Sequence, residues 1–119
     1  MQQESSSNFE NLAIYQIALQ FVMAMYGLIA IIPKNDAYGL AKLMKQAAIG
    51  ITTNIGASSK KKSHSDKARY LNLARESLEE CRYYLNFVEE VGYARTSDLK
   101  HHLQQVSELL EEHASWTTD

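Results

Sequence analysis

The chain has 119 residues, 12 of them basic and 14 acidic, which gives a formal net charge of -2. This length fits one domain with a modest core, and the charge excludes general affinity for nucleic acid, so any RNA contact must be local. The single cysteine, Cys81, excludes an internal disulfide and fits a reducing compartment. The chain also shows no basic n-region and no signal cleavage site, so we expect a cytoplasmic protein.

The first predicted helix covers residues 9–32. It follows a polar segment, residues 1–8, that we expect to be disordered. Asn8 is the expected N-cap, and Pro33 ends the helix because proline forces the preceding residue out of the helical region.

This first helix is apolar almost all round, since Gln16 and Gln20 are its only plainly polar side chains between Leu12 and Ile32. Such a helix indicates a membrane span, the centre of a large core, or burial on one side by its own domain and on the other by a partner. The two glutamines and an acidic flank argue against a membrane span. We therefore expect a homo-oligomer and no membrane.

The second predicted helix covers residues 36–57, with Asn35 or Asp36 as its cap. Apolar residues recur along it at helical spacing, and several small residues would let a neighbouring helix approach closely. The apolar residues are Leu40, Met44, Ala47, Ile51 and Ile55, and the small ones are Ala41, Ala47, Ala48 and Gly50.

The third predicted helix covers residues 65–91, starts at a cap at Ser63 or Ser65 and ends at Gly92. Its seam of apolar residues is typical of a bundle core. The seam consists of Leu71, Ala74, Leu78, Cys81, Leu85 and Val88.

A fourth helix is predicted over residues 97–113, with Thr96 or Ser97 as its cap. Short connections return each helix beside the preceding one. The sequence thus predicts an all-α fold, an antiparallel up-down-up-down four-helix bundle over residues 9–116.

We find no constellation of catalytic residues. Cys81 lies between Leu78 and Leu85 on the core seam, which indicates a packing thiol. His101 and His102 diverge on a helix, and no Glu-x-x-His motif, phosphate loop or nucleophilic triad is present. We expect no cofactor, no metal and no enzymatic activity.

One segment is basic. It is either a solvated loop or a phosphate-binding surface, and its candidate nucleic-acid-binding residues are Lys60, Lys61, Lys62, His64, Lys67 and Arg69. The chain also has seven tyrosines, for which packing at helix or subunit contacts is favoured over stacking on RNA bases, because most lie in predicted helices.

Four motifs, in order, support a family resemblance: FENLAIYQIAL, Pro33 with YGL, AAIGITTNIGAS and LNLARESLEEC. With them the chain resembles the four-helix-bundle proteins encoded in 23S rRNA intervening sequences, which are related to the accessory variability proteins of diversity-generating retroelements. The resemblance implies a left-handed bundle, a homopentameric ring, no enzymatic activity, and an RNA or ribonucleoprotein role. A protein-interaction scaffold or accessory subunit without direct nucleic-acid binding is the alternative function.

By position, the structural motif residues of that family correspond to Asn54, Ser77 and Glu80. The chain departs from the family pattern at Gln46, which replaces an arginine, at Gly50, which replaces a serine, and at Ala57-Ser58, which replace Glu-Gly. An amide beside the buried stripe needs partners, so we expect Asn54 to bond with Ser77 or Glu80 unless it is exposed and bonds only water.

Overall fold

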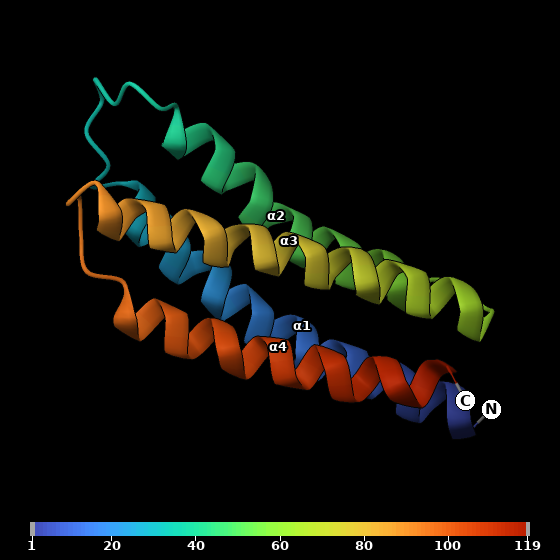
Figure 1. Ribbon diagram of the computed structural model, residues 1–119. Helices are drawn as coiled ribbons and strands as arrows, with labels where there is room; N and C mark the ends of the chain where they lie inside the picture. Colours follow the sequence, from blue (N-terminus) through green and yellow to red (C-terminus); the bar gives the residue numbers. More distant parts are fainter. Residues whose placement is uncertain (1, 119) are drawn as a thin grey trace.

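The computed structural model describes the backbone of residues 2–118 and the side chains of residues 12–113, and this part contains helices and no strand. The helices are α1 (Gln2–Ile29), α2 (Leu40–Ser59), α3 (His64–Glu90) and α4 (Ser97–Thr118). Successive helices run in opposite directions, and both α1 and α3 pack against α2 and α4 (Figure 1). The predicted all-α four-helix bundle is confirmed, while its left-handed twist stays a prediction.

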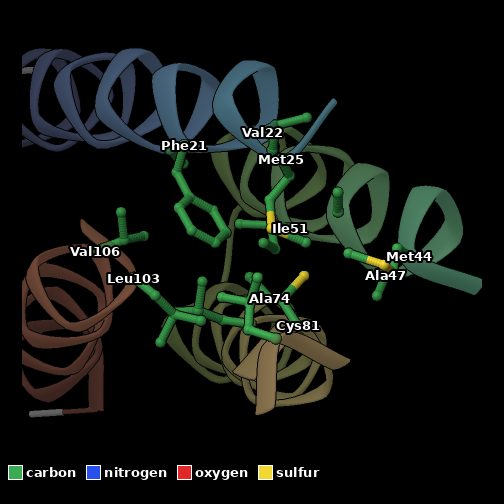
Figure 2. Packing of buried hydrophobic residues seen from close by; sticks show 14 of the residues in the cluster. Phe21, Val22, Met25, Met44, Ala47, Ile51, Ala74, Cys81, Leu103 and Val106 are labelled. Atoms are coloured by element: carbon green, nitrogen blue, oxygen red, sulfur yellow. The ribbon is translucent and has the colours of Figure 1, made fainter. Parts of the chain in front are cut away.

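The core is apolar and receives side chains from all four helices. Phe21 of α1 points into the space between the helices, towards Ile51 of α2 and Leu103 of α4 (Figure 2). All six seam residues predicted for the third helix are fully buried. The spacing of apolar residues therefore identified the inner face of α3 correctly.

The outer face of α1 is exposed, although it carries no charged residue between Leu12 and Ile32. Within the described residues one stretch, Leu12–Ile29, is long and apolar enough to cross a membrane by length and composition, and 39% of it is buried inside the bundle. A core helix of a soluble protein meets the same criteria. Met23 is 66% exposed and Leu12 is 56% exposed, so α1 buries only part of its apolar surface within one chain.

The observed α1 differs from the prediction at both ends. Its backbone is helical from Gln2, within the segment 1–8 that we expected to be disordered, because that segment contains no glycine or proline to stop a helix. The cap predicted at Asn8 falls inside the helix, and the Asn8 side chain lies outside the described residues. At the other end α1 stops at Ile29, before the predicted Ile32, as the chain tightens into i→i+3 hydrogen bonds ahead of proline.

The second helix starts at Leu40 and not at the predicted position 36. Gly39 precedes it with φ of 67°, a left-handed conformation that a continuous α-helix cannot contain. Gly39 therefore occupies the cap position predicted for Asn35 or Asp36, while the Asp36 Oδ2 accepts the backbone N–H of Leu40, the first residue of α2, at 2.9 Å. The Asp36 Oδ1 accepts the hydroxyl of Tyr93 at 2.6 Å, which ties the α1–α2 connection to the α3–α4 connection.

The ends of α3 follow the predicted signals. The side chain of Ser63 accepts the backbone N–H of Asp66 at 3.1 Å, which confirms Ser63 as the cap. Gly92, with φ of 81°, follows the helix, and the next N–H, from Tyr93, bonds the carbonyl of Val88.

The start of α4 at Ser97 also matches the prediction, while its end at Thr118 lies beyond the predicted residue 113. The carbonyl of Thr96 accepts the N–H of Lys100, so Thr96 occupies the cap position. Its backbone N–H and its hydroxyl both donate to Glu89 of α3. One carboxylate therefore fixes the start of α4 against the end of α3.

Candidate nucleic-acid interface

The basic segment (Lys60–Arg69) connects α2 to α3 and forms the first turns of α3. In Figure 1 this connection lies at the same end of the bundle as the start of α1 and the end of α4. The segment is mainly exposed, with Lys60, Lys62 and Arg69 open to solvent. Its positive charge is thus concentrated at one end of the molecule.

Tyr70 lies between two of these cations. The Nζ of Lys61 lies 4.7 Å from the centre of the Tyr70 ring, and the guanidinium carbon of Arg69 lies 5.0 Å from it. Arg69 also donates a hydrogen bond to the Tyr70 hydroxyl at 3.2 Å. This hydrogen bond and the charges of Lys61 and Arg69 lower the pKa of the Tyr70 hydroxyl.

A groove of about 420 Å³ runs beside this cluster, between α1 and α2. We call it the Tyr15 groove, and it is lined by Tyr15, Thr52, Thr53, Gly56, Ala57, Lys60 and Lys61. Two lysines and no acidic residue line it. Among residues 12–113 neither the ammonium groups of Lys60 and Lys61 nor the hydroxyl of Tyr15 has a hydrogen bond or an ion pair. The groove can therefore offer all three groups to an anionic ligand.

The structure brings together only part of the predicted site. Lys60 and Lys61 line the Tyr15 groove, and Arg69 joins them through Tyr70. Lys62, His64 and Lys67 belong to the same end of the bundle but line neither this groove nor the Tyr70 cluster. Lys67 has a structural contact through its backbone, since its carbonyl accepts the hydroxyl of the buried Ser58 at 3.1 Å.

The predicted motif residue Asn54 has another partner than those we expected. Its Nδ2 donates to the carbonyl of Gly50, one turn earlier in α2, at 2.8 Å, and within the described residues it bonds neither Ser77 nor Glu80. Ser77 instead packs against Gly50, where an added Cβ would lie 2.5 Å from its Oγ. Gly50 and Ser77 thus form a contact between α2 and α3, and Asn54 bonds the backbone of α2 at the same glycine.

Glu80 lies apart from Asn54, on the outer surface of α3. It lines an open groove of about 670 Å³ between α3 and α4, which we call the acidic groove. The lining residues are Asn72, Arg75, Glu76, Glu79, Glu80, Tyr83 and Ser107. Three carboxylates and one guanidinium make this surface negative.

Cys81 is fully buried, as the core seam predicted. Burial, and to a smaller extent the nearby carboxylate of Glu80, raise the pKa of the Cys81 thiol to about 12. The thiol therefore stays protonated and packs as an apolar side chain. Among the described residues no three His, Cys, Asp or Glu side chains gather in a group that could hold a metal ion.

The aromatic part of the interface could not be found from the sequence. Tyr15 lies in α1, far from the basic segment along the chain, and reaches it only because α1 packs against the end of α2. Tyr70 directly follows Arg69, and this Arg-Tyr pair beside three lysines is the one local signal that could have indicated it. The sequence favours a packing role for both tyrosines.

Comparison with known proteins gives a family and a fold. The model of the family described as 23S rRNA-intervening sequence protein matches residues 10–113. The structure is similar to the 1.70 Å crystal structure of a protein of unknown function from the S23 ribosomal protein family of Bacteroides thetaiotaomicron. The two share 16% identity with a TM-score of 0.79, over 89% of this chain and 98% of the other. This similarity supports the fold alone, and no curated protein matches the chain.

Proposed function

The chain belongs to the 23S rRNA-intervening sequence protein family, and we propose that it is a non-enzymatic, homo-oligomeric, cytoplasmic protein that binds RNA. The proposal is supported by one observation: basic side chains and aromatic rings lie close together at one end of the bundle. Lys60 and Lys61 line a groove with Tyr15, and Lys61 also lies over Tyr70. Proteins that hold RNA commonly combine cations for the phosphates with aromatic side chains for the bases.

Oligomerisation is part of the proposal, because one chain offers few phosphate contacts. The rest of the chain is acidic, given a net charge of -2, so a single basic segment would bind RNA weakly and in a salt-dependent manner. Several copies in one assembly would engage one RNA together and raise the apparent affinity. We propose the homopentamer that the family resemblance implies, assembled through the exposed apolar face of α1.

Charge reversal in the basic segment tests the RNA proposal. We expect the triple variant Lys60→Glu, Lys61→Glu and Lys62→Glu to lose RNA binding together with its salt dependence, because each neutralised phosphate contributes to both. Binding is measured by fluorescence anisotropy at several salt concentrations, with melting temperatures to verify folding.

The matched control reverses the same number of exposed lysines at the other end of the bundle, Lys34, Lys42 and Lys45. This variant has the same net charge but keeps the basic segment, so it should retain most of the affinity. Equal losses in the two variants would assign the effect to net charge, and a wild-type protein that binds no RNA at low salt would contradict the proposed function.

The acidic groove favours a second function, a scaffold or accessory subunit that binds a protein partner. Glu76 and Glu80 have no cationic partner within the described residues, and Tyr83 beside them is 68% exposed. Such a surface suits a basic protein segment with an apolar anchor. Purification from the native host, followed by RNA sequencing and mass spectrometry of bound material, would separate the two functions.

A further inference from the structure

Two of the five glycines stand where an added side chain would meet no other part of the bundle. Gly39 and Gly92 have positive φ, and Gly50 leaves room for Ser77, so each of these three has a role within the fold. At Gly27 and Gly56, by contrast, an added Cβ would meet nothing within 4 Å. Both lie inside helices, which glycine weakens relative to alanine, so a reason for them must be sought outside the chain.

Gly56 belongs to the Tyr15 groove. Thr53, Gly56, Ala57 and Lys60 line it at helical spacing of three, four and seven residues, so they share one face of α2. A side chain at position 56 would project from that face into the groove. The glycine therefore keeps open a space that the folded chain itself does not use.

The residues that line the Tyr15 groove indicate which class of ligand fits it. Its walls are small or aromatic, with Gly56 and Ala57 on α2 and Tyr15 on α1, while Lys60 and Lys61 add positive charge at one end. A ligand that fits has a flat, weakly polar part joined to an anionic group. A nucleotide of a single strand has both, whereas a duplex keeps its bases stacked inside and presents only phosphates.

We propose that the Tyr15 groove binds one unstacked base of single-stranded RNA, with the adjoining phosphate at Lys60 and Lys61. This inference rests on the proposed RNA-binding function and adds a specificity to it. The protein prefers single-stranded to duplex RNA, and Gly56 is the position that sets this preference.

Filling the groove without changing its charge tests the inference. We expect Gly56→Leu to weaken binding of a short fluorescein-labelled single-stranded RNA about tenfold, the loss typical of one stacked base. Binding of the same RNA annealed to its complement should stay unchanged, because the phosphate contacts of the lysines remain. Gly56→Ala, which fills little of the groove, is the matched control and should bind like the wild type.

The outcomes distinguish the two proposals. Wild-type protein that binds no RNA contradicts the proposed function and this inference together. The other outcome is RNA binding that responds to charge reversal in the basic segment but is equal for both RNA forms and unaffected by Gly56→Leu. It would support the proposed function and contradict base binding in the Tyr15 groove. Thr53→Leu, at an exposed lining position, fills the groove without adding an aromatic ring and should reproduce the selective loss. This variant replaces Gly56→Leu in the test if Gly56→Leu fails to fold.

Discussion

Glu89 shows how one exposed carboxylate connects two helices. It accepts the backbone N–H of Thr96 at 2.7 Å, the Thr96 hydroxyl at 2.8 Å and the ammonium of Lys100 at 3.1 Å. These three donors lower the pKa of Glu89 to about 2, from a usual value of 4.5. The ionised form is thus favoured in the folded state, which makes the junction of α3 and α4 sensitive to acid.

We expect Glu89 to stabilise the fold above pH 4.5, and this contribution to disappear as the pH falls towards 2, because a lowered carboxyl pKa stabilises only while the group is ionised. Glu89→Gln should lower the melting temperature at pH 7 by a few degrees, and the difference from wild type should vanish near pH 2. Thermal unfolding followed by circular dichroism measures both. Glu90→Gln is the control, since Glu90 makes no ion pair among residues 12–113, and equal behaviour of the two variants would contradict the assignment.

At the scale of the helix, the sequence predicted inner faces better than ends. Apolar spacing identified the buried seam of α3. The ends of α3 were also predicted, because the capping signals at Ser63 and Gly92 depend only on neighbouring residues in the sequence. The start of α2 was missed because it depends on the left-handed conformation of Gly39 and on Asp36 bonding Tyr93 of a distant connection.

In the candidate site, too, the sequence predicts the local features and misses those that depend on helix packing. Its cations are consecutive in sequence and were identified, whereas Tyr15 enters the groove only through the packing of α1 on α2. The contact between Gly50 and Ser77 likewise depends on the register of two helices, which apolar spacing alone does not determine.

The close approach of α2 and α3 at this contact predicts a coupling between Gly50 and Ser77. Gly50→Ala should destabilise the wild type by up to about 2 kcal/mol, because overpacking of the new methyl group against the Ser77 side chain outweighs a gain of about 1 kcal/mol in helix propensity. With Ser77→Ala in place, the 2.5 Å contact to Oγ is gone, so the same change should cost much less. A double-mutant cycle by urea unfolding measures the coupling, and an equal cost in both backgrounds would show that Ser77 does not limit this position.

For the whole molecule, the outer face of α1 is an uncharged surface that one chain leaves uncovered. Small residues lie along it, and Gly27 among them offers open space where a second helix could approach closely. The exposed residues of α1 from position 12 on are Leu12, Ala13, Gln16, Gln20, Met23, Ala24, Tyr26 and Gly27, and Ala30 and Ile31 follow directly after the helix. A face so rich in apolar and small residues is typical of a subunit contact.

We expect the wild type to form a homo-oligomer, and Ala24→Glu or Gly27→Glu to dissociate it, because each places a carboxylate in the apolar contact. Light scattering coupled to gel filtration should then give the mass of one chain, 13.5 kDa, for these variants, with the helical content retained. Asn86→Glu, a change at an exposed position of α3, should leave the assembly intact. If the wild type itself is a monodisperse monomer at micromolar concentration without detergent, α1 has no such partner, and RNA binding would have to depend on a single basic segment.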